Sequence, residues 1–367
     1  MNAQQQTAKS IIVGLGTTGL SVARFLQKQE SNFAVMDSRE TPPNAEDLKQ
    51  DFADVPSHFG SFNSDWLNQA DQIIVNPGIA VATPEIAQAV DAGAEVVGDI
   101  ELFAREVKNT KPVIAITGSN GKTTVTMLLD LMAKKSGFNV GTGGNIGTAA
   151  LDLLDDKNTD LYVLELSSFQ LETTTSLQTV SAVILNVSED HLDRYDNNIE
   201  TYADAKGIIY NNCQHIVYNR DDAYSTRLAK KAAGNDGNNE KNANNKSTIS
   251  FGLDAPEAGQ YGITKQDGTD YLAKGDELLM PISEVKLPGL HNVANALATL
   301  ALGDFAGLKL SAMLDVLREY AGMDHRTQWL AKIQGVNWYN DSKGTNVGAT
   351  LAALTGLTGK TVLIAGG

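Results

Sequence analysis

The sequence predicts an α/β protein with parallel sheets, arranged as two complete domains followed by part of a third. Short apolar runs alternate with helical patterns along most of the chain, as expected for strand–helix–strand units around a parallel sheet. Two of these runs lead into glycine-rich turns that open a helix. The length of 367 residues fits two or three domains of about 100–200 residues each.

The first segment, residues 1–108, has the pattern expected of one such domain. The predicted strands cover residues 11–13, 33–36 and 72–75, and the predicted helices cover residues 20–27 and 101–108. Residues 109–112, which end in a proline, interrupt the helical pattern. We therefore place a domain boundary there.

The second segment, residues 109–322, contains near-continuous apolar runs that indicate strands covered on both faces. The predicted strands cover residues 113–116, 161–164 and 182–185, and the predicted helices cover residues 125–133, 201–210, 292–302 and 311–320. Gly322 is expected to cap the last of these helices. Residues 232–248 are rich in Asn, Gly and Lys, which predicts an exposed, mobile loop.

The third segment, residues 323–367, is shorter than the roughly 100 residues that an independent α/β domain usually needs. Its pattern predicts a strand at 336–339, a helix at 347–354 and a last strand at 361–364. We expect the chain to be a fragment that lacks most of its last domain. Such a fragment should have a mobile end and be nearly inactive as an enzyme.

The composition excludes several classes of protein. Apolar residues make up 42% and charged residues 20%, so disorder as the dominant state is not expected. The formal charge of −15 argues against a nucleic-acid or anionic-membrane surface. The sequence has no run of ~18 apolar residues that could span a membrane and no signal-peptide pattern. Cys213 is the single cysteine, which excludes an internal disulfide and fits a reducing cytoplasm.

The first glycine-rich turn follows the strand at 11–13 and predicts a phosphate-binding turn. The glycines permit close approach of a diphosphate, and the helix N-terminus supplies N–H donors. The turn consists of Gly14, Leu15, Gly16, Thr17, Thr18 and Gly19. Asp37 ends the next strand and could bind a ribose hydroxyl, as in NAD-dependent enzymes. From these residues alone, NAD, another nucleotide and a turn that serves only packing all remain open.

The second glycine-rich turn predicts a nucleoside triphosphate site. Its residues follow the strand at 113–116 and are Thr117, Gly118, Ser119, Asn120, Gly121, Lys122, Thr123 and Thr124. Lys122 could neutralise the β- and γ-phosphates, and the Thr123 hydroxyl could hold Mg²⁺. Ile116 stands where the common phosphate loop has its first glycine, so the spacing departs from that motif. The alternative is a glycine-rich turn with a surface lysine.

Several polar residues follow other predicted strands. Glu165 ends a strand and could complete a Mg²⁺ shell beside Thr123. His191 lies in an acidic loop after the strand at 182–185 and could ligate a second metal, although most lone loop histidines do not. Lys343 could stabilise charge on a phosphoryl group, and Arg326 could clamp a phosphate. The alternative for Glu165 is a surface acid at the end of a strand, and the alternative for the others is an ordinary polar loop or connection.

Taken together and in this order, the motifs resemble the Mur ligases of bacterial cell-wall synthesis. The resemblance covers the chain from Ile11 to Gly367 and is most specific over residues 36–43, 76–80, 165–173 and 186–195. The loop at 118–123 marks the wider superfamily, which includes the folylpolyglutamate synthases. The strands that end at Asp37 and Glu165 select the branch that adds D-glutamate.

The resemblance implies three domains and a two-step reaction. Residues 1–108 would form a Rossmann-like domain that binds a UDP-linked substrate, residues 109–322 a central P-loop-type ATPase domain with a parallel sheet, and residues 323–367 part of a Rossmann-like C-terminal domain. The implied enzyme is an ADP-forming ligase. It would join D-glutamate to UDP-N-acetylmuramoyl-L-alanine through an acyl phosphate in peptidoglycan precursor synthesis, as a cytoplasmic monomer with ATP as co-substrate.

The resemblance also implies roles for individual residues, and it replaces NAD at the first turn by the uridine diphosphate of the substrate. The implied substrate-binding residues are those of the first turn with Asp37, Ser38, Arg39, Asn76, Gly78, Asn145 and Ser167. The implied ATP-binding residues are Gly118 to Thr124 with Asn292, Asn295, Arg326 and Asp341. Catalytic roles are implied for Lys122, Glu165, His191, Lys206 and Lys343. Two Mg²⁺ ions would use Thr123 and Glu165, and His191 and a carbamylated Lys206.

Three alternatives to this interpretation remain at the level of the sequence. An NAD-dependent oxidoreductase would explain the first turn and Asp37, but it leaves the loop at Lys122 and the cluster at His191 unexplained. A folylpolyglutamate-type ligase shares the ATP loop but does not need the first turn. A non-catalytic nucleotide-binding fragment would follow from the short third segment.

Overall fold

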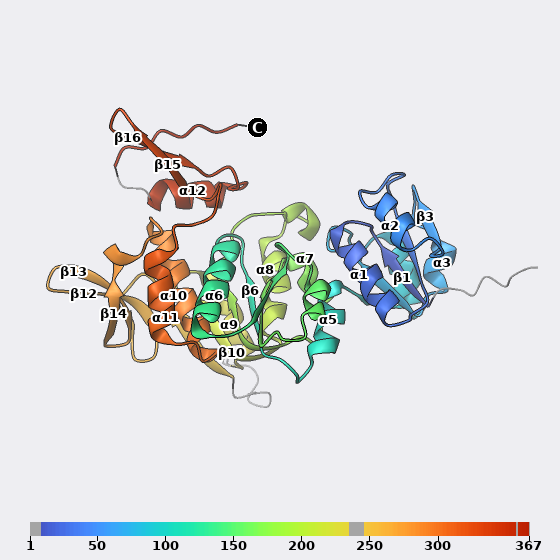
Figure 1. Cartoon of the computed structure of the whole chain (residues 1–367), viewed down its shortest axis with the longest axis horizontal. Coiled ribbons are helices and arrows are strands. Elements are labelled where there is room, and N and C mark those ends of the chain that lie inside the picture. Colours follow the sequence, from blue (N-terminus) through green and yellow to red (C-terminus); the bar gives the residue numbers. More distant parts are fainter. Residues whose placement is uncertain (1–8, 235–245, 357–358, 367) are drawn as a thin grey trace, which may run out of the picture. The chain divides into compact units, whose positions relative to one another are not determined.

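The computed structural model describes residues 9–234, 246–356 and 359–366 (Figure 1). The chain forms two compact units, and both are discontinuous in sequence. Unit 1 consists of Met1–Thr110, Gly143–Lys157 and Leu166–Leu177. Unit 2 consists of Lys111–Thr142, Asn158–Glu165 and Gln178–Gly367. Among the described residues, no helix is long and apolar enough to cross a membrane.

Unit 1 is built on a five-stranded parallel sheet in the order β3-β2-β1-β4-β5. The strands are β1 (Ser10–Val13), β2 (Phe33–Asp37), β3 (Ser57–Phe59), β4 (Gln72–Val75) and β5 (Glu95–Val97). The helices are α1 (Thr17–Lys28), α2 (Ala45–Asp51), α3 (Ser64–Asn68), α4 (Pro84–Asp91) and α5 (Asp99–Val107). The strand order reverses between β1 and β4, and in such sheets ligands bind at this point, beyond the carboxyl ends of the strands.

Four carboxylates, all but Asp155 buried or partly buried, attach the two later segments to the body of unit 1. Asp152, in the 3-10 helix η1 (Ala150–Asp155), accepts bonds from Ser21 (2.8 Å) and Arg24 (3.0 Å) of α1. Asp99 bonds to Gln170 in α7 (Ser168–Leu171) at 3.3 Å. The other two carboxylates are Glu101, which accepts from the backbone of Thr175 and Ser176 at 2.8 and 2.9 Å, and Asp155, which bonds to Lys28.

Unit 2 contains a nine-stranded sheet in the order β14-β13-β12-β11-β10-β9-β6-β8-β7. The strands are β6 (Val113–Thr117), β7 (Val140–Gly144), β8 (Leu161–Glu165), β9 (Gln178–Ile184), β10 (Asn212–Asn219), β11 (Ser247–Phe251), β12 (Tyr261–Gln266), β13 (Thr269–Lys274) and β14 (Glu277–Pro281). β6 pairs in parallel with β8 and β9, whereas β12, β13 and β14 form an antiparallel meander.

The core of unit 2 lies between this sheet and three helices that pack on it (Figure 1). These are α6 (Lys122–Ser136), α10 (Leu290–Phe305) and α11 (Leu310–Glu319). Unit 2 also contains the helices α8 (Ile199–Gly207) and α9 (Ala223–Ala232) and the 3-10 helices η2 (Leu192–Tyr195), η3 (Ile208–Tyr210) and η4 (Ile282–Glu284). α10 is buried along most of its length, which explains its continuous apolar sequence.

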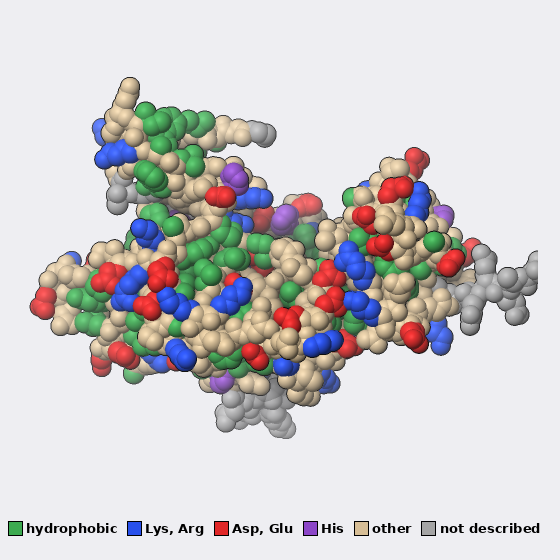
Figure 2. All heavy atoms as spheres, viewed as in Figure 1, with side chains coloured by type: hydrophobic (Ala, Val, Ile, Leu, Met, Phe, Trp, Pro, Cys, Tyr) green, Lys and Arg blue, Asp and Glu red, His purple; other side chains and the backbone are tan. Residues whose placement is uncertain are grey.

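The end of the described chain consists of a hairpin and one helix: β15 (Gln328–Ile333), β16 (Val336–Asn340) and α12 (Val347–Gly356). Gln334 and Gly335 connect the strands with φ values of +51° and +83°, as in a two-residue turn of the primed type. Large apolar side chains lie on the surface of this hairpin (Figure 2), among them Trp329, Ile333 and Val336.

Most of the predicted elements are confirmed, and three expectations need correction. The predicted last strand at 361–364 is wrong: residues 361–366 form no strand, and with no pairing partner Val362 and Ile364 are exposed. Tyr320 is the C-cap residue of α11, and Gly322 (φ +103°) lies two residues beyond it. The loop expected at 232–248 lies mainly outside the described residues, and β11 already begins at Ser247.

Candidate active site

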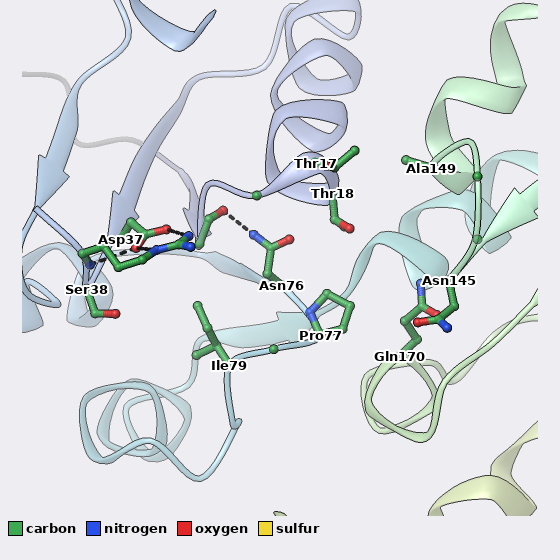
Figure 3. A pocket seen from close by; sticks show the side chains of 16 residues that line it. Thr17, Thr18, Asp37, Ser38, Asn76, Pro77, Ile79, Asn145, Ala149 and Gln170 are labelled. Carbon is green, nitrogen blue, oxygen red and sulfur yellow. Dashed lines mark hydrogen bonds and ion pairs between the residues drawn. The ribbon is translucent and has the colours of Figure 1, made fainter. Parts of the chain in front are cut away.

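A cavity of about 620 Å³ opens beyond the carboxyl ends of the unit 1 strands (Figure 3). Every residue that lines it belongs to unit 1. From the first segment of the chain it is lined by Gly14, Gly16, Thr17, Thr18, Asp37, Ser38, Arg39, Asn76, Pro77, Gly78 and Ile79. From the two later segments it is lined by Gly144, Asn145, Gly147, Ala149 and Gln170. The structure therefore brings together most of the residues expected to bind the UDP-linked substrate.

The first glycine turn has the tight geometry that the sequence predicts. A Cβ atom on Gly19 would lie 2.1 Å from the carbonyl oxygen of Gly14, so a side chain there would force the turn open. Gly14 has φ +100°, and the Asn76 amide donates to its carbonyl oxygen. A Cβ atom on Gly16, in contrast, would meet no atom within 4 Å. The backbone at Gly16 is thus open to a ligand, next to the N–H groups of the first turn of α1.

Asp37 is buried, and both of its carboxylate oxygens already accept hydrogen bonds. Oδ2 accepts from the Leu15 N–H (2.8 Å) and from Arg39 Nη2 (2.6 Å), and Oδ1 accepts from the Arg39 backbone and Nε. Burial alone would raise the pKa of Asp37, but the bonds from Arg39 and Leu15 outweigh it and lower the pKa. Because four bonds use the acceptor positions of the carboxylate, a ribose diol could bind Asp37 only by displacing Arg39.

The opposite wall of the cavity depends on a buried hydrogen-bonded chain. Ser167 and Gln170 form a capping box at the start of α7: the Gln170 N–H donates to Ser167 Oγ, and the Ser167 N–H donates to Gln170 Oε1, both at 3.2 Å. The Gln170 amide nitrogen donates to Asp99, which is 2% exposed. Burial raises the pKa of Asp99 to about 6.

The phosphate loop of unit 2 lies between β6 and α6. Gly121, the N-cap residue of α6, has φ +86°, and a Cβ atom there would lie 2.6 Å from Asn295 Oδ1. Asn120 exchanges two hydrogen bonds with Asn186: its N–H donates to Asn186 Oδ1 (2.9 Å), and its carbonyl accepts from Asn186 Nδ2 (3.0 Å). The loop conformation is therefore held by strand-end residues as well as by its own glycines.

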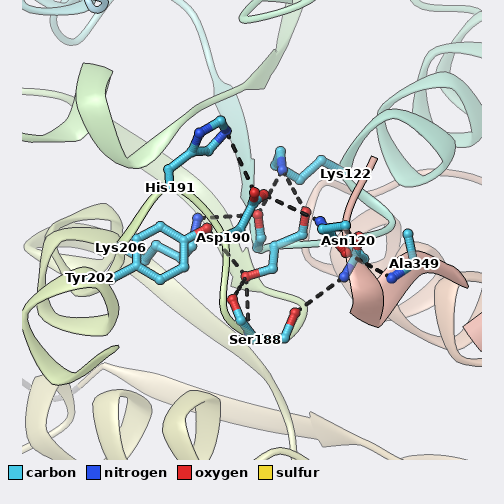
Figure 4. A network of polar contacts seen from close by, with 11 residues as sticks. Asn120, Lys122, Ser188, Asp190, His191, Tyr202, Lys206 and Ala349 are labelled. Carbon is cyan, nitrogen blue, oxygen red and sulfur yellow. Dashed lines mark hydrogen bonds and ion pairs between the residues drawn. The ribbon is translucent and has the colours of Figure 1, made fainter. Parts of the chain in front are cut away.

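Two lysines converge on this loop (Figure 4). Lys122 Nζ donates to the carbonyl oxygens of Gly118 (2.7 Å) and Ser119 (3.0 Å), and Lys206 Nζ donates to the same Gly118 oxygen (3.1 Å). Burial lowers the pKa of Lys122, partly offset by the charges of Glu165 and Asp190. Burial and the charge of Lys122 lower the pKa of Lys206 well below its ordinary value.

The residues expected to hold the first Mg²⁺ are in direct contact. The Thr123 hydroxyl donates to Glu165 Oε2 (2.9 Å) and accepts from Arg326 Nη2 (3.0 Å). Thr123 and Glu165 are both buried. Hydroxyl and carboxylate oxygens suit a hard cation, so this pair fits the proposed ion. The described part of the chain holds no group of three or more His, Cys, Asp or Glu side chains arranged as a ready metal site.

The other residues of unit 2 that were expected to bind ATP or metal, or to act in catalysis, differ in exposure and in hydrogen-bond partners. His191 Nε2 lies 3.8 Å from Asp190 Oδ1, and its side chain is 60% exposed. Asn295 donates to Asn292 (3.2 Å) beside the phosphate loop. Asp341 accepts from the N–H of Thr327 (2.8 Å) in the loop before β15. Thr124 is half-buried in α6, and Lys343 is exposed before α12.

Three residues that sequence reasoning did not select belong to the network around the phosphate loop. Tyr202 bonds to Ser119 through its hydroxyl (3.2 Å), and its ring lies 4.3 Å from Lys206 Nζ. Asp190 and Asn346 bond to each other at 3.3 Å. Tyr202 precedes Lys206 by one helical turn, a spacing that could have indicated it. The sequence around Asn346 gave no signal, because its partners are distant along the chain.

Comparison with protein families matches two ranges of the chain. Residues 8–98 match the family described as "Mur ligase MurD-like, N-terminal domain". Residues 116–303 match "Mur ligase middle domain". Both families are Mur ligase families rather than families of NAD-dependent oxidoreductases.

Curated relatives match nearly the whole chain. UDP-N-acetylmuramoylalanine–D-glutamate ligase from Legionella pneumophila (strain Philadelphia 1) is 45% identical over 97% of this chain and 78% of its own length. Proteins of the same name from Nitrosococcus oceani and Pseudomonas syringae pv. tomato are 47% and 49% identical over 99% and 97% of this chain, each over 77% of its own length.

Solved structures share the fold at lower identity. MurC from Thermotoga maritima, a UDP-N-acetylmuramate–alanine ligase, has a TM-score of 0.52 at 23% identity and covers 90% of this chain and 73% of its own. MurF from Acinetobacter baumannii has a TM-score of 0.54 at 17% identity, over 98% of this chain and 71% of its own. These similarities concern the fold alone.

Proposed function

The chain belongs to the Mur ligase family, and from this premise we propose that it is an ADP-forming ligase that joins D-glutamate to UDP-N-acetylmuramoyl-L-alanine. The observation that carries the proposal is its 45–49% identity, over nearly its whole length, to ligases named for this activity. The product would be a precursor of peptidoglycan, so the enzyme would serve cell-wall synthesis.

In this proposal the unit 1 cavity binds the UDP-linked substrate. The diphosphate lies at the open backbone of Gly16, where the first N–H groups of α1 point toward it. Ser38 and the Asp37–Arg39 pair face the uracil, with Asp37 fixing the guanidinium of Arg39. Asn145 and Ser167 bind the muramoyl part of the substrate, on the wall formed by the later segments of the chain.

The phosphate loop of unit 2 binds ATP. Its backbone amides hold phosphate oxygens, and Lys122 turns from the carbonyls of Gly118 and Ser119 to the β- and γ-phosphates. Phosphate charge would favour the protonated form of Lys122 and so oppose the lowering of its pKa by burial. Asn292, Asn295, Arg326 and Asp341 complete the ATP site.

The chemistry has two steps. In the first, a carboxylate oxygen of the UDP-linked substrate forms a bond to the γ-phosphorus, and the bond to the β–γ bridging oxygen breaks, which releases ADP. In the second, the amine of D-glutamate attacks the acyl carbon, the bond to the phosphate oxygen breaks, and the amine proton passes to solvent. Lys122 and Lys343 stabilise the negative charge that gathers around the transferring phosphoryl group.

Two Mg²⁺ ions would assist this reaction. Thr123 and Glu165 would hold the first, and His191 and Lys206 the second. The ions supply positive charge between a carboxylate and a triphosphate that otherwise repel each other. An ammonium or amine cannot provide the hard anionic oxygen that Mg²⁺ prefers, so the second ion requires a modified Lys206.

Lys206 is suited to carbamylation. It is 1% exposed, and its lowered pKa favours the neutral amine, which is the form that attacks CO₂. The nitrogen forms a bond to the carbon of CO₂ and loses one proton, which leaves an anionic carbamate. Lys122, whose charge disfavours a protonated Lys206, would stabilise that anion. Bicarbonate labelled with ¹³C should then give a protein-bound carbamate resonance that Lys206→Ala abolishes.

We place the enzyme in the cytoplasm, because its reaction consumes ATP and its single cysteine forms no internal disulfide. The monomer remains an expectation from the resemblance to the Mur ligases. The test of the function is ADP release by a chain extended to the full length of these relatives, in the presence of ATP, Mg²⁺ and UDP-N-acetylmuramoyl-L-alanine, with and without D-glutamate. Calorimetric binding of the UDP-linked substrate gives a second readout that does not require turnover. Binding of NAD without binding of the UDP-linked substrate would refute the proposal.

A further inference from the structure

The N-terminus of α12 rests on the phosphate loop. Asn346, directly before α12, donates from Nδ2 to Asn120 Oδ1 and to Asp190 Oδ2, both at 3.3 Å. Its Oδ1 accepts from the Ala349 N–H at 2.8 Å, which caps the helix. A single amide thus fixes the start of α12 and joins it to the loop expected to hold ATP (Figure 4).

Gly348 gives independent evidence that the two elements are closely packed. A Cβ atom at Gly348 would lie 2.9 Å from Ser188 Oγ and 3.1 Å from Asn120 Nδ2. Asn120 Nδ2 itself donates to Ser188 Oγ at 3.3 Å. A side chain at Gly348 would therefore require the Ser188 hydroxyl and the Asn120 amide to move from these positions.

We propose that Asn346 is a positioning residue that couples ATP binding at the phosphate loop to the packing of the α12 N-terminus on that loop. This packing is called the seating of α12 below. Its partner Asn120 is one of the loop residues, and the exposed Lys343 lies three residues before Asn346 in the connection to α12. Seating of α12 therefore also restricts where Lys343 can reach. The proposal rests on the proposed ATP site and adds the residue that links this site to the third segment.

The coupling must act in both directions. If the seated α12 holds Asn120 in the conformation that binds phosphate, loss of the contact between α12 and the phosphate loop weakens ATP binding. By thermodynamic linkage, bound ATP must then stabilise the seated α12 by the same factor. The affinity for the UDP-linked substrate, which is proposed to bind in unit 1, should not depend on whether α12 is seated.

Two variants separate seating from helix stability. Asn346→Ser keeps a good N-cap acceptor but loses the amide donors to Asn120 and Asp190. Gly348→Ala favours the helical conformation of α12, because alanine has the higher helix propensity. Its new methyl group would, however, hinder the packing of α12 on Ser188 and Asn120. Thr350→Ala is the matched control: it also raises helix propensity, and its hydroxyl donates to the Asn346 carbonyl oxygen inside the helix.

The experiment measures binding of a non-hydrolysable ATP analogue by calorimetry, and hydrogen exchange over residues 343–351 with and without the analogue. Asn346→Ser and Gly348→Ala should each weaken binding by about tenfold, the effect of roughly one to two hydrogen bonds. Both should lose the protection that the analogue confers on α12. Thr350→Ala and the affinity for the UDP-linked substrate should stay as in the wild type.

Two results would overturn the proposal and leave the proposed function intact. One is wild-type affinity for the analogue in both variants. The other is a Gly348→Ala protein whose α12 is more protected than in the wild type with and without analogue, which would show that only helix propensity matters. Failure of the wild type to bind the analogue would overturn the proposal together with its ATP site.

Discussion

Replacing Asp99 by Asn should change how the stability of unit 1 depends on pH. The Asp99 side chain is buried at the start of α5, and its Oδ1 has no hydrogen-bond partner among the described residues. Burial raises its pKa from 3.8 to about 6, although the bond from Gln170 and the nearby backbone N–H groups of Ile100 and Asp99 act in the opposite direction.

The direction of the shift fixes the sign of the effect. Between the two pKa values the folded protein keeps a proton that the unfolded chain has released, so the free energy of unfolding falls as the pH rises through the folded pKa. A shift of about 2 pKa units at 1.36 kcal/mol each corresponds to roughly 3 kcal/mol in total. About 1.4 kcal/mol of this loss lies between about pH 5 and pH 8, above the sequence pI near 4.7.

An Asn at position 99 cannot titrate, so this pH-dependent loss should disappear. Its amide nitrogen would occupy the place of an unpartnered oxygen and lower stability by an amount that does not depend on pH. The informative quantity is therefore the difference in unfolding free energy between variant and wild type. This difference should shift in favour of Asp99→Asn by about 1.4 kcal/mol between about pH 5 and pH 8.

Urea unfolding followed by Trp66 fluorescence would measure this quantity for unit 1, in a background where Trp329 and Trp338 are replaced by Phe. Asp54→Asn removes an exposed carboxylate of the same unit and controls for the loss of a charge. Parallel pH dependences of Asp99→Asn and its parent would refute the reasoning, since they would show that Asp99 has the same pKa in the folded and unfolded states.

Four further predictions concern the two ligand sites. Lys122→Ala should weaken binding of an ATP analogue by tenfold or more, because a charge-assisted contact contributes ~1.5–3 kcal/mol, while calorimetry should show unchanged affinity for the UDP-linked substrate; equal loss of both would indicate a damaged fold. In a chain extended to the full length of its relatives, Lys206→Glu should keep more ligase activity than Lys206→Ala, since only Glu replaces the anionic oxygens of a carbamate, and equal rates of ADP release would contradict this. Gly19→Ala should unfold the first turn and abolish substrate binding, because its Cβ would lie 2.1 Å from the Gly14 carbonyl oxygen. Gly16→Ala should instead melt like the wild type and lose only substrate affinity, and a lowered melting temperature would exclude the open-backbone interpretation.

The strands β1, β2, β4, β6, β8 and β9 were predictable from sequence because their apolar runs are mostly buried on both faces. β4 begins and ends at the predicted residues, and β6 extends one residue further than predicted. Nine strands were missed, because their mixed burial leaves no continuous apolar run. They are β3, β5, β7, β10, β11, the antiparallel strands β12 to β14 and the hairpin strand β15. The apolar run at 361–364 shows the opposite error, since an apolar run forms a strand only where a neighbour pairs with it.

The candidate site shows the same division between local and long-range information. Glycine turns and strand-end acids such as Glu165 are visible in the sequence because their position in one strand–turn–helix unit defines them. Asn346 contacts Asn120 across 226 positions and Asp190 across 156. No local sequence pattern indicates contacts between residues so far apart, so only the three-dimensional structure could show them.

The discontinuous construction of unit 1 has a consequence for how this protein can be divided. A cut at the boundary near residue 108 would leave the glycine turn and Asp37 on one piece, and Asn145 and Gln170, from the opposite wall of the cavity, on the other. The chain passes between the two units five times, and one passage joins Glu165 to Leu166, between a proposed Mg²⁺ ligand and the capping box of α7. Recombination or domain exchange with a related ligase would therefore have to transfer three separate stretches of sequence together to carry over substrate recognition.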